Sequence, residues 1–317
     1  MPPTDGDGLP LAPLTRLRWQ AAWQASGIAP EAVLGEVAGQ VVRAEAVVEA
    51  ALRAGCPPAV CPVVLAAVRA MLQPAFALPA LLQSPWPWAP LLIVHGPVAR
   101  RLGFVAGAGV LGPGPGPNAA AGRALTLWLR REWGRRWRPP VLGTPAAFGL
   151  CLAEAEDRLP VGWWPLHVER GVPAGRGAVT VVASEGPVGL ATVQPADGLA
   201  VLSGLLEVLR TTHYAGGTYV VVLAPPHAQA LAAHGLAKRD LRAYLAENAC
   251  RTLWDLKETA RLGGDPRPED TAALRCVVRR AEDILVVVAG GDEAGYSVVV
   301  PAWAGGAVSQ AVTVPLD

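Results

Sequence analysis

The sequence predicts an α/β protein with mainly parallel-type strands, flanking helices and a helical N-terminal segment. Hydrophobic residues fill 52% of the 317 positions and charged residues 17%, which provides enough apolar material for a large core. Short apolar runs rich in β-branched residues, such as LLIV at 91–94, are typical of strands buried on both faces. These runs alternate with stretches in which apolar residues recur every three or four positions, as they do in helices.

Helices are expected where the apolar spacing is helical. The clearest pattern covers residues 30–54, because Pro30 suits a first helical turn and Gly55 suits the position just past a helix end. Asn118 is expected to cap a helix over 119–133. Further helices are expected at 59–72, 197–210 and 238–248, and shorter ones are expected to end at 102 and 233.

Strands are expected where short apolar or alternating runs are bounded by turn residues. These runs lie at 91–94, 147–156, 178–184, 219–223, 284–289 and 297–300. Proline, glycine and polar residues predict loops at 83–90, 107–117 and 261–270. Residues 1–14 are expected to form a flexible tail.

Two segments share one pattern. APLLIVHGPVARRLGF and GTYVVVLAPPHAQALAAHG both contain a strand, a tight proline turn, a short helix and a glycine. This echo predicts two similarly built halves, 15–140 with the Gly-rich loop and 141–317; the alternative is that any two strand–turn–helix units look alike. Ligands of open α/β sheets bind at the carboxyl ends of strands, which here are 95–97, 225–227 and 289–291.

Charge and hydropathy argue against several classes of protein. The formal net charge is +1, so nothing global indicates binding to nucleic acid. No apolar run reaches the roughly 18 residues of a membrane span. The N-terminus also lacks the basic start and apolar stretch of a signal peptide. We therefore expect a cytoplasmic protein with neither a membrane nor a nucleic acid as partner.

The five cysteines form an odd, scattered set, which is not typical of a disulfide framework. Cys56 and Cys61 in CPPAVC lack the second ligand pair that a zinc knuckle needs. We expect reduced thiols at Cys56, Cys151 and Cys250, and we assign no metal ligand and no cofactor.

The Gly-rich stretch LGPGPGPNAAAGRA is the first candidate for a binding site. A Gly-rich loop that leads into a helix presents free backbone N–H groups, which suit phosphate or carboxylate. Arg123, in the first turns of that helix, could pair with an anion. The stretch lacks the Gly-Lys-Ser/Thr of a P-loop, and the alternative is a tight crossover loop. Candidate substrate-binding residues are His95, Gly114, Asn118, Arg123 and Glu185, the last because it follows a strand end.

Two further segments carry acid–base candidates. In AFGLCLAEAE, strand alternation places Glu154 and Glu156 on one face, where they could share a proton or hold a cation. The alternative is a strand end exposed to solvent. In GWWPLHVERG, an extended backbone would orient His167 and Glu169 the same way, as a general base beside a carboxylate. The alternative is a surface pair of Glu169 and Arg170 beside a packed histidine.

The chain resembles an uncharacterised bacterial family associated with UGSC-type (seleno)proteins. The matching segments are ALRAGCPP, PLLIVHGP, LGPGPGPNAAAGRALTL, FGLCLAEAE, WPLHVERG, VVLAPPHAQALAAHG and EDILVVVAGG. The resemblance implies an α/β fold with a site around the Gly-rich loop. His95-Gly96 stands where the family has Asn-Gly, and Val105-Ala106 stands where it has Asn-Ser. The chain therefore looks like a divergent paralogue with fewer polar residues in its loops.

Two functions remain open. The first is a subunit of a small-molecule-processing enzyme with hydrolase, lyase or thiol-linked chemistry, whose catalytic residues would be Glu154, Glu156, His167, Glu169 and Cys56. The second is a catalytically degenerate paralogue that serves as structural or regulatory partner of an active subunit. In either case the eleven tryptophans, several in Pro-rich loops, predict a homo- or hetero-oligomer.

Overall fold

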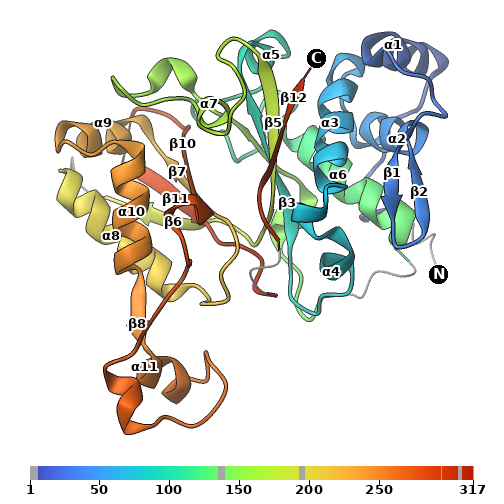
Figure 1. Ribbon diagram of the computed structural model, residues 1–317. Coiled ribbons are helices and arrows are strands. Elements are labelled where there is room, and N and C mark those ends of the chain that lie inside the picture. Colours follow the sequence, from blue (N-terminus) through green and yellow to red (C-terminus); the bar gives the residue numbers. More distant parts are fainter. Residues whose placement is uncertain (1–5, 135–139, 193–196, 294, 306–308, 317) are drawn as a thin grey trace.

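The computed structural model describes residues 6–134, 140–192, 197–293, 295–305 and 309–316. It confirms the α/β class: two four-stranded sheets pack face to face, and helices cover their outer faces (Figure 1). The first sheet has the order β12-β5-β3-β4, formed by β3 (Ala89–His95), β4 (Leu150–Ala153), β5 (Gly177–Ser184) and β12 (Val312–Leu316). The second has the order β10-β7-β11-β6, formed by β6 (Val188–Ala191), β7 (Tyr219–Leu223), β10 (Ile284–Val288) and β11 (Tyr296–Val300).

Alternate residues of the central strands enter different cores. Leu91 and Ile93 of β3 pack between the two sheets against Val220 and Val222 of β7. Leu92, one residue along, faces the helices of the first sheet. Both faces of these strands are therefore apolar, which explains the continuous apolar runs in the sequence.

The expectation of mainly parallel strands is wrong. Only β3–β4 and β7–β10 are parallel, and every other pair among the described strands is antiparallel. The physical reason is that antiparallel strands covered on both faces show the same apolar runs as parallel ones. Burial, not strand direction, produced the pattern.

The two sheets share one strand pattern, a parallel pair followed by two antiparallel neighbours. Their last strands are exchanged, because β6 follows β5 in the chain but pairs with β11, whereas β12 follows β11 but pairs with β5. The expected boundary at residue 140 falls between β3 and β4, which are hydrogen-bonded neighbours in one sheet.

The outer helices form two layers. The first sheet is covered by α3 (Cys61–Met71) and α6 (Asn118–Trp133), and α2 (Ala44–Ala54) packs on these two helices; α1 (Arg16–Ser26) packs beyond them, and α4 (Leu78–Leu82) lies at one end. The second is covered by α8 (Gly198–Thr211), α9 (Pro225–Ala233) and α10 (Lys238–Asn248). Two short helices, α5 (Pro97–Arg101) and α7 (Leu166–Glu169), follow strands.

Residues 30–54 do not form one helix. The first part is a hairpin of β1 (Val33–Val37) and β2 (Gln40–Arg43), and only the remainder is α2. Ala38 and Gly39 at the turn have φ values of 51° and 77°. A two-residue turn with both φ values positive suits a hairpin, and this turn interrupts the helical periodicity.

The N-terminal tail is not free over its described part. Arg123 forms an ion pair with Asp7, with 2.6 Å between Nε and Oδ2, and the Ala12 N–H donates to the Arg53 carbonyl. The hydrogen bond from Arg123 holds the pKa of Asp7 below its ordinary value, against the opposing effect of burial. These contacts connect Asp7 and Ala12 to α6 and α2, and the flexibility of the tail stays a prediction.

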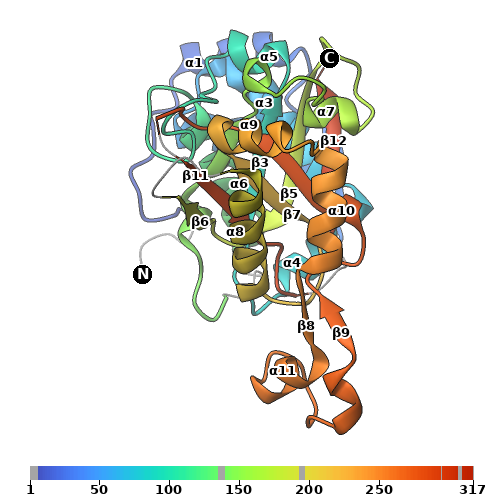
Figure 2. The same ribbon diagram turned by 90° about the vertical axis from the view of Figure 1, so that its left-hand side faces the viewer.

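An arm projects from the body beyond α10 (Figure 2). It contains β8 (Cys250–Thr252), α11 (Leu253–Glu258) and β9 (Leu274–Cys276), and a disulfide joins Cys250 to Cys276 at its base. The prediction of a reduced Cys250 is therefore wrong, because strand pairing across the arm brings together two cysteines 26 residues apart. Cys56, Cys61 and Cys151 are free and buried.

Within the described ranges, no single helix has the length and apolar composition of a membrane span. The segments 58–71 and 74–82 pass that test only when the two are taken together, and they are bent by 75°.

Candidate functional site

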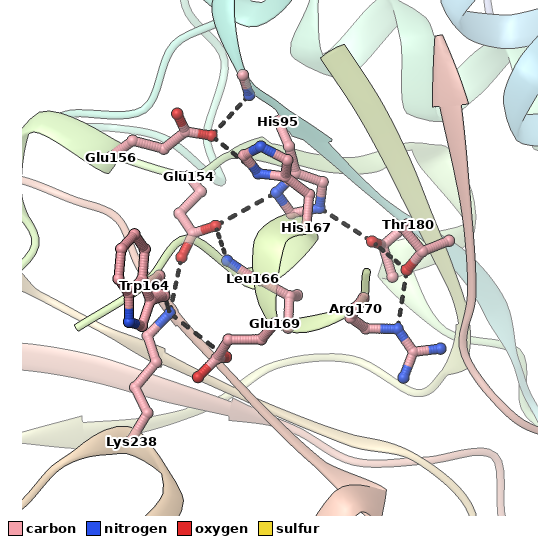
Figure 3. A network of polar contacts seen from close by, with 12 residues as sticks. His95, Glu154, Glu156, Trp164, Leu166, His167, Glu169, Arg170, Thr180 and Lys238 are labelled. Atoms are coloured by element: carbon pink, nitrogen blue, oxygen red, sulfur yellow. Dashed lines mark hydrogen bonds and ion pairs between the residues drawn. The ribbon is translucent and has the colours of Figure 1, made fainter. Parts of the chain in front are cut away.

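Polar side chains gather where β3 and β4 end, since parallel neighbours carry their carboxyl ends to the same edge (Figure 3). His95 is the last residue of β3, and Glu154 directly follows β4. Glu156 begins the 3-10 turn Glu156–Arg158, and His167 belongs to α7. We call these four residues, His95, Glu154, Glu156 and His167, the His–Glu cluster.

Glu154 has the most contacts in the cluster. Its Oε2 accepts the Leu166 N–H at 2.7 Å and lies 3.3 Å from His95 Nδ1. Its Oε1 accepts a hydrogen bond from Lys238 Nζ at 3.0 Å. Burial raises the pKa of Glu154, but the charge of Lys238 and the hydrogen bond with His95 outweigh burial, so the pKa lies below its ordinary value. Glu154 is thus a buried carboxylate.

Lys238 reaches the cluster from the helix layer of the second sheet. This first residue of α10 is only 2% exposed, and its Nζ also donates to the Trp164 carbonyl at 2.7 Å. The same Nζ lies 3.9 Å from Glu169 Oε2, and Arg242, one turn further along α10, binds that carboxylate. One buried ammonium therefore lies between two carboxylates.

Glu156 and His167 face each other. Glu156 Oε1 accepts the Gly96 N–H at 2.6 Å and lies 3.3 Å from His167 Nδ1. Burial, together with the charge of Glu154, raises the pKa of Glu156. Burial and the charge of His95 lower the pKa of His167 to about 4, so this imidazole is neutral at pH 7.

A string of hydrogen bonds supports the other side of His95. His95 Nε2 lies 2.9 Å from the Thr180 hydroxyl of β5, which lies 2.9 Å from the Thr313 hydroxyl of β12. Arg170 Nε donates to Thr313 at 2.9 Å. Because a hydroxyl can both donate and accept, this string fixes the orientation of the His95 ring and is compatible with either tautomer.

A cavity of about 790 Å³ adjoins the cluster. Residues 106–112 of the Gly-rich stretch and residues 289–291 after β10 line it. Ala155 and Asp157, on either side of Glu156, line it as well. Arg100 also lines the cavity, and its charge acts on Glu156, whose side chain is the most exposed of the cluster at 16%. Two of the three strand ends expected to lie at a ligand site therefore meet near this cavity.

The structure brings together four of the predicted site residues, His95, Glu154, Glu156 and His167, and Lys238 connects Glu169 to them. Two local expectations were wrong. The strand ends at Ala153, so Glu154 and Glu156 lie beyond it in a turn. The segment at His167 is helical because Pro165 precedes a single turn, and His167 and Glu169 consequently have different partners.

Two predicted residues lie far from this edge. Cys56 is fully buried among the helices of the first sheet, and burial raises its pKa, so no reactive thiolate is available. Glu185 follows Ser184, which pairs with Ala89 at the start of β3, whereas His95 is at its end. Glu185 therefore lies at the opposite end of the sheet.

The binding residues predicted from the Gly-rich stretch either contact other parts of the chain or lie away from the cavity. Asn118 is not an N-cap, because its side chain binds the N–H and carbonyl of Val105 at 2.8 and 2.9 Å. Arg123 is occupied by Asp7. Gly114 lies outside the part of the loop that lines the cavity.

Sequence reasoning missed Lys238, Arg242, Thr180 and Thr313. Thr180 could have been found, since it is a polar residue within the apolar run AVTVVA. Lys238 and Arg242 have no local signal, because their ion pairs with Glu154 and Glu169 join distant parts of the chain.

No protein-family model matches the chain, and no curated protein is significantly similar to it. The resemblance to UGSC-type proteins therefore stays a prediction.

Proposed function

We propose that the chain is a small-molecule-processing enzyme, or a subunit of one, that performs hydrolysis or elimination at the His–Glu cluster. One observation carries the proposal: two imidazoles and two carboxylates from three segments of the chain converge beside a cavity. Burial of such groups is unfavourable unless they are paired, and folded proteins concentrate them at functional sites.

Hydrolysis and elimination both need proton transfer at a bound substrate. Neutral His167 and ionised Glu154 can accept a proton, whereas the raised pKa of Glu156 makes it the better proton donor of the two glutamates. Arg100, at the cavity wall, is suited to orient an anionic group of the substrate. Thiol-linked chemistry is dropped because Cys56 lies in the core.

A second candidate is the catalytically degenerate partner subunit, and two observations favour it. Residues 107–117 contain no polar side chain. In the second sheet, the Ala289 N–H donates to the Leu223 carbonyl. In the first sheet, the Glu154 N–H donates to the Val94 carbonyl in the same way. Ala289 thus takes the place of Glu154, and the equivalent position in the second sheet is apolar.

A ligand screen by thermal shift separates the two functions. We expect one class of small molecules to raise the melting temperature of the wild type. Ala108→Trp, which places a large side chain at the cavity wall, should abolish the shift, whereas Ala233→Trp at the end of α9 should not. Glu156→Gln should retain binding and lose turnover. Absence of any ligand, or equal shifts in the Ala108→Trp variant, would favour the partner subunit.

The proposed partners are a small molecule and a second subunit, either a copy of this chain or a paralogue. Of the four loop tryptophans that suggested an interface, Trp86 and Trp164 are 53% and 62% exposed, and Trp88 and Trp163 are buried. Exposed aromatic side chains favour association. Light scattering that shows a monomer at micromolar concentration, alone and in native extract, would contradict the oligomer.

A further inference from the structure

We infer that the His–Glu cluster binds one divalent transition-metal ion through one atom each of His95, Glu154, Glu156 and His167. The inference deepens the proposed function by naming a cofactor for the same site. The four candidate ligand atoms all lie within 4.8 Å of one another. A cation about 2.0–2.2 Å from each atom would place the ligands roughly 3.0–4.3 Å apart. The site therefore needs only a small contraction.

His167 supplies the independent observation. It is 1% exposed, yet neither ring nitrogen has a hydrogen-bond partner, although Nδ1 lies 3.3 Å from Glu156 Oε1. A buried imidazole without a partner is rare, and each such group needs an explanation. A cation shared with Glu156 satisfies both side chains at once. The competing explanation is a simple imidazole–carboxylate pair that closes by a small rotation.

The surrounding contacts orient the ligands as they do in known metal centres. A metal-bound histidine usually donates its other N–H to a fixed acceptor. His95 meets this pattern when Nδ1 faces the cation, because Nε2 then donates to Thr180. Glu154 is held by Lys238 and Leu166, and Glu156 is held by the Gly96 N–H.

The charges are consistent with a further cation. Three carboxylates, Glu154, Glu156 and Glu169, lie around two cationic side chains in direct contact with them, Lys238 and Arg242. A divalent ion beside Glu154 and Glu156 would reduce the repulsion between these two carboxylates.

The donor set selects the metal. Two nitrogen and two oxygen ligands suit Zn²⁺, Co²⁺, Mn²⁺ or Fe²⁺, whereas Mg²⁺ and Ca²⁺ prefer oxygen ligands alone. Bound there, the ion would polarise a substrate oxygen or lower the pKa of a bound water, both of which serve hydrolysis or elimination.

Metal binding can be measured without a substrate. The full chain is stripped with a chelator and titrated with Co²⁺, which gives a visible absorption band, and metal content after Zn²⁺ loading is measured by mass spectrometry. We expect about one ion per chain and a thermal shift with Zn²⁺ but not with Mg²⁺. His167→Asn and Glu156→Gln should each weaken binding by about tenfold or more.

Two variants control for adventitious binding and for folding. His234→Asn removes an exposed histidine, and Glu207→Gln removes an exposed carboxylate on α8; both should bind like the wild type. Circular dichroism checks that each variant is folded. Wild-type protein that retains no ion, or a folded His167→Asn variant with unchanged affinity, would overturn the metal site. A thermal shift with a small molecule, or turnover, in metal-free protein would leave the proposed enzyme function intact. Failure of the metal site can therefore be distinguished from failure of the enzyme function.

Discussion

Lys238 Nζ lies 3.0 Å from Glu154 Oε1, and this ion pair joins the first sheet to the helix layer of the second. Lys238 begins a helix that packs on the second sheet, and Glu154 directly follows a strand of the first. Both side chains are almost fully buried, at 2% and 0% exposure. The pair therefore anchors the candidate site across the interface between the sheets.

Removal of Lys238 should strongly destabilise the protein. In Lys238→Met the Glu154 carboxylate remains buried without its cation, and breaking a buried pair from one side costs about 3–5 kcal/mol. Urea unfolding of wild type and variant measures this difference. The double variant Lys238→Met/Glu154→Gln should recover part of the loss, because it removes the unpaired charge. A loss below about 1 kcal/mol in the single variant would mean that water or a rearrangement replaces the lysine.

The sequence predicted those parts of the fold that depend on local patterns. The strand at Tyr219–Leu223 and the helix at Lys238–Asn248 have the predicted bounds, because an apolar run and a helical repeat are local properties. Strand direction and the exchange of β6 and β12 could not be predicted, since both depend on pairing between residues far apart.

The candidate site was predictable where polar residues interrupt apolar surroundings. His95, Glu154, Glu156 and His167 each stand at the end of a predicted element or in a short motif, and they do converge. Arg123 and Asn118 gave an equally polar signal but make structural contacts. Sequence pattern therefore identifies candidates, and only the three-dimensional contacts separate ligand-type groups from those that hold loops in place.

Gly122→Ala should destabilise the protein, whereas Gly114→Ala should leave its stability nearly unchanged. A Cβ at Gly122 would lie 2.6 Å from the backbone nitrogen of Leu150, because α6 packs closely on β4. Helix propensity alone would make Gly122→Ala stabilising by about 1 kcal/mol, but the overpacking should outweigh this and cost about 2–3 kcal/mol.

Gly114→Ala is the matched control, since a Cβ there meets nothing within 4 Å. We expect a change within about 0.5 kcal/mol by urea unfolding. A stabilised Gly122→Ala variant would show that α6 can move away from β4 at little cost.

Reduction of the Cys250–Cys276 disulfide should loosen the arm and leave the body folded. The disulfide closes the base of a segment in which few residues are buried, so its loss raises the chance of local opening. Limited trypsin digestion should cleave within the arm several-fold faster in reduced protein and in Cys250→Ser/Cys276→Ser than in oxidised protein. Oxidised protein treated with the alkylating reagent alone, without the reductant, is the control. Equal cleavage rates would mean that β8–β9 pairing alone holds the arm.

The contribution of the Asp7–Arg123 ion pair should depend on pH. The pKa of Asp7 is lowered in the folded protein, chiefly by its hydrogen bond with Arg123, against the opposing effect of burial. Folding therefore favours the ionised carboxylate. The resulting stability is fully present above the ordinary pKa of about 3.8. It is lost as the pH falls through the lower, folded value.

Asp7→Asn should accordingly cost about 1–2 kcal/mol at pH 7, as expected for a hydrogen bond to a charged group. The difference from wild type should shrink as the pH falls below 4, since the wild-type carboxyl then becomes protonated. Asp265→Asn, in an exposed loop, is the control and should show no such trend. Urea unfolding at pH 7, 5 and 3 provides the comparison. A difference that stays constant across this range would show that the carboxyl acts through packing of residues 6–14 on α6 rather than through its charge.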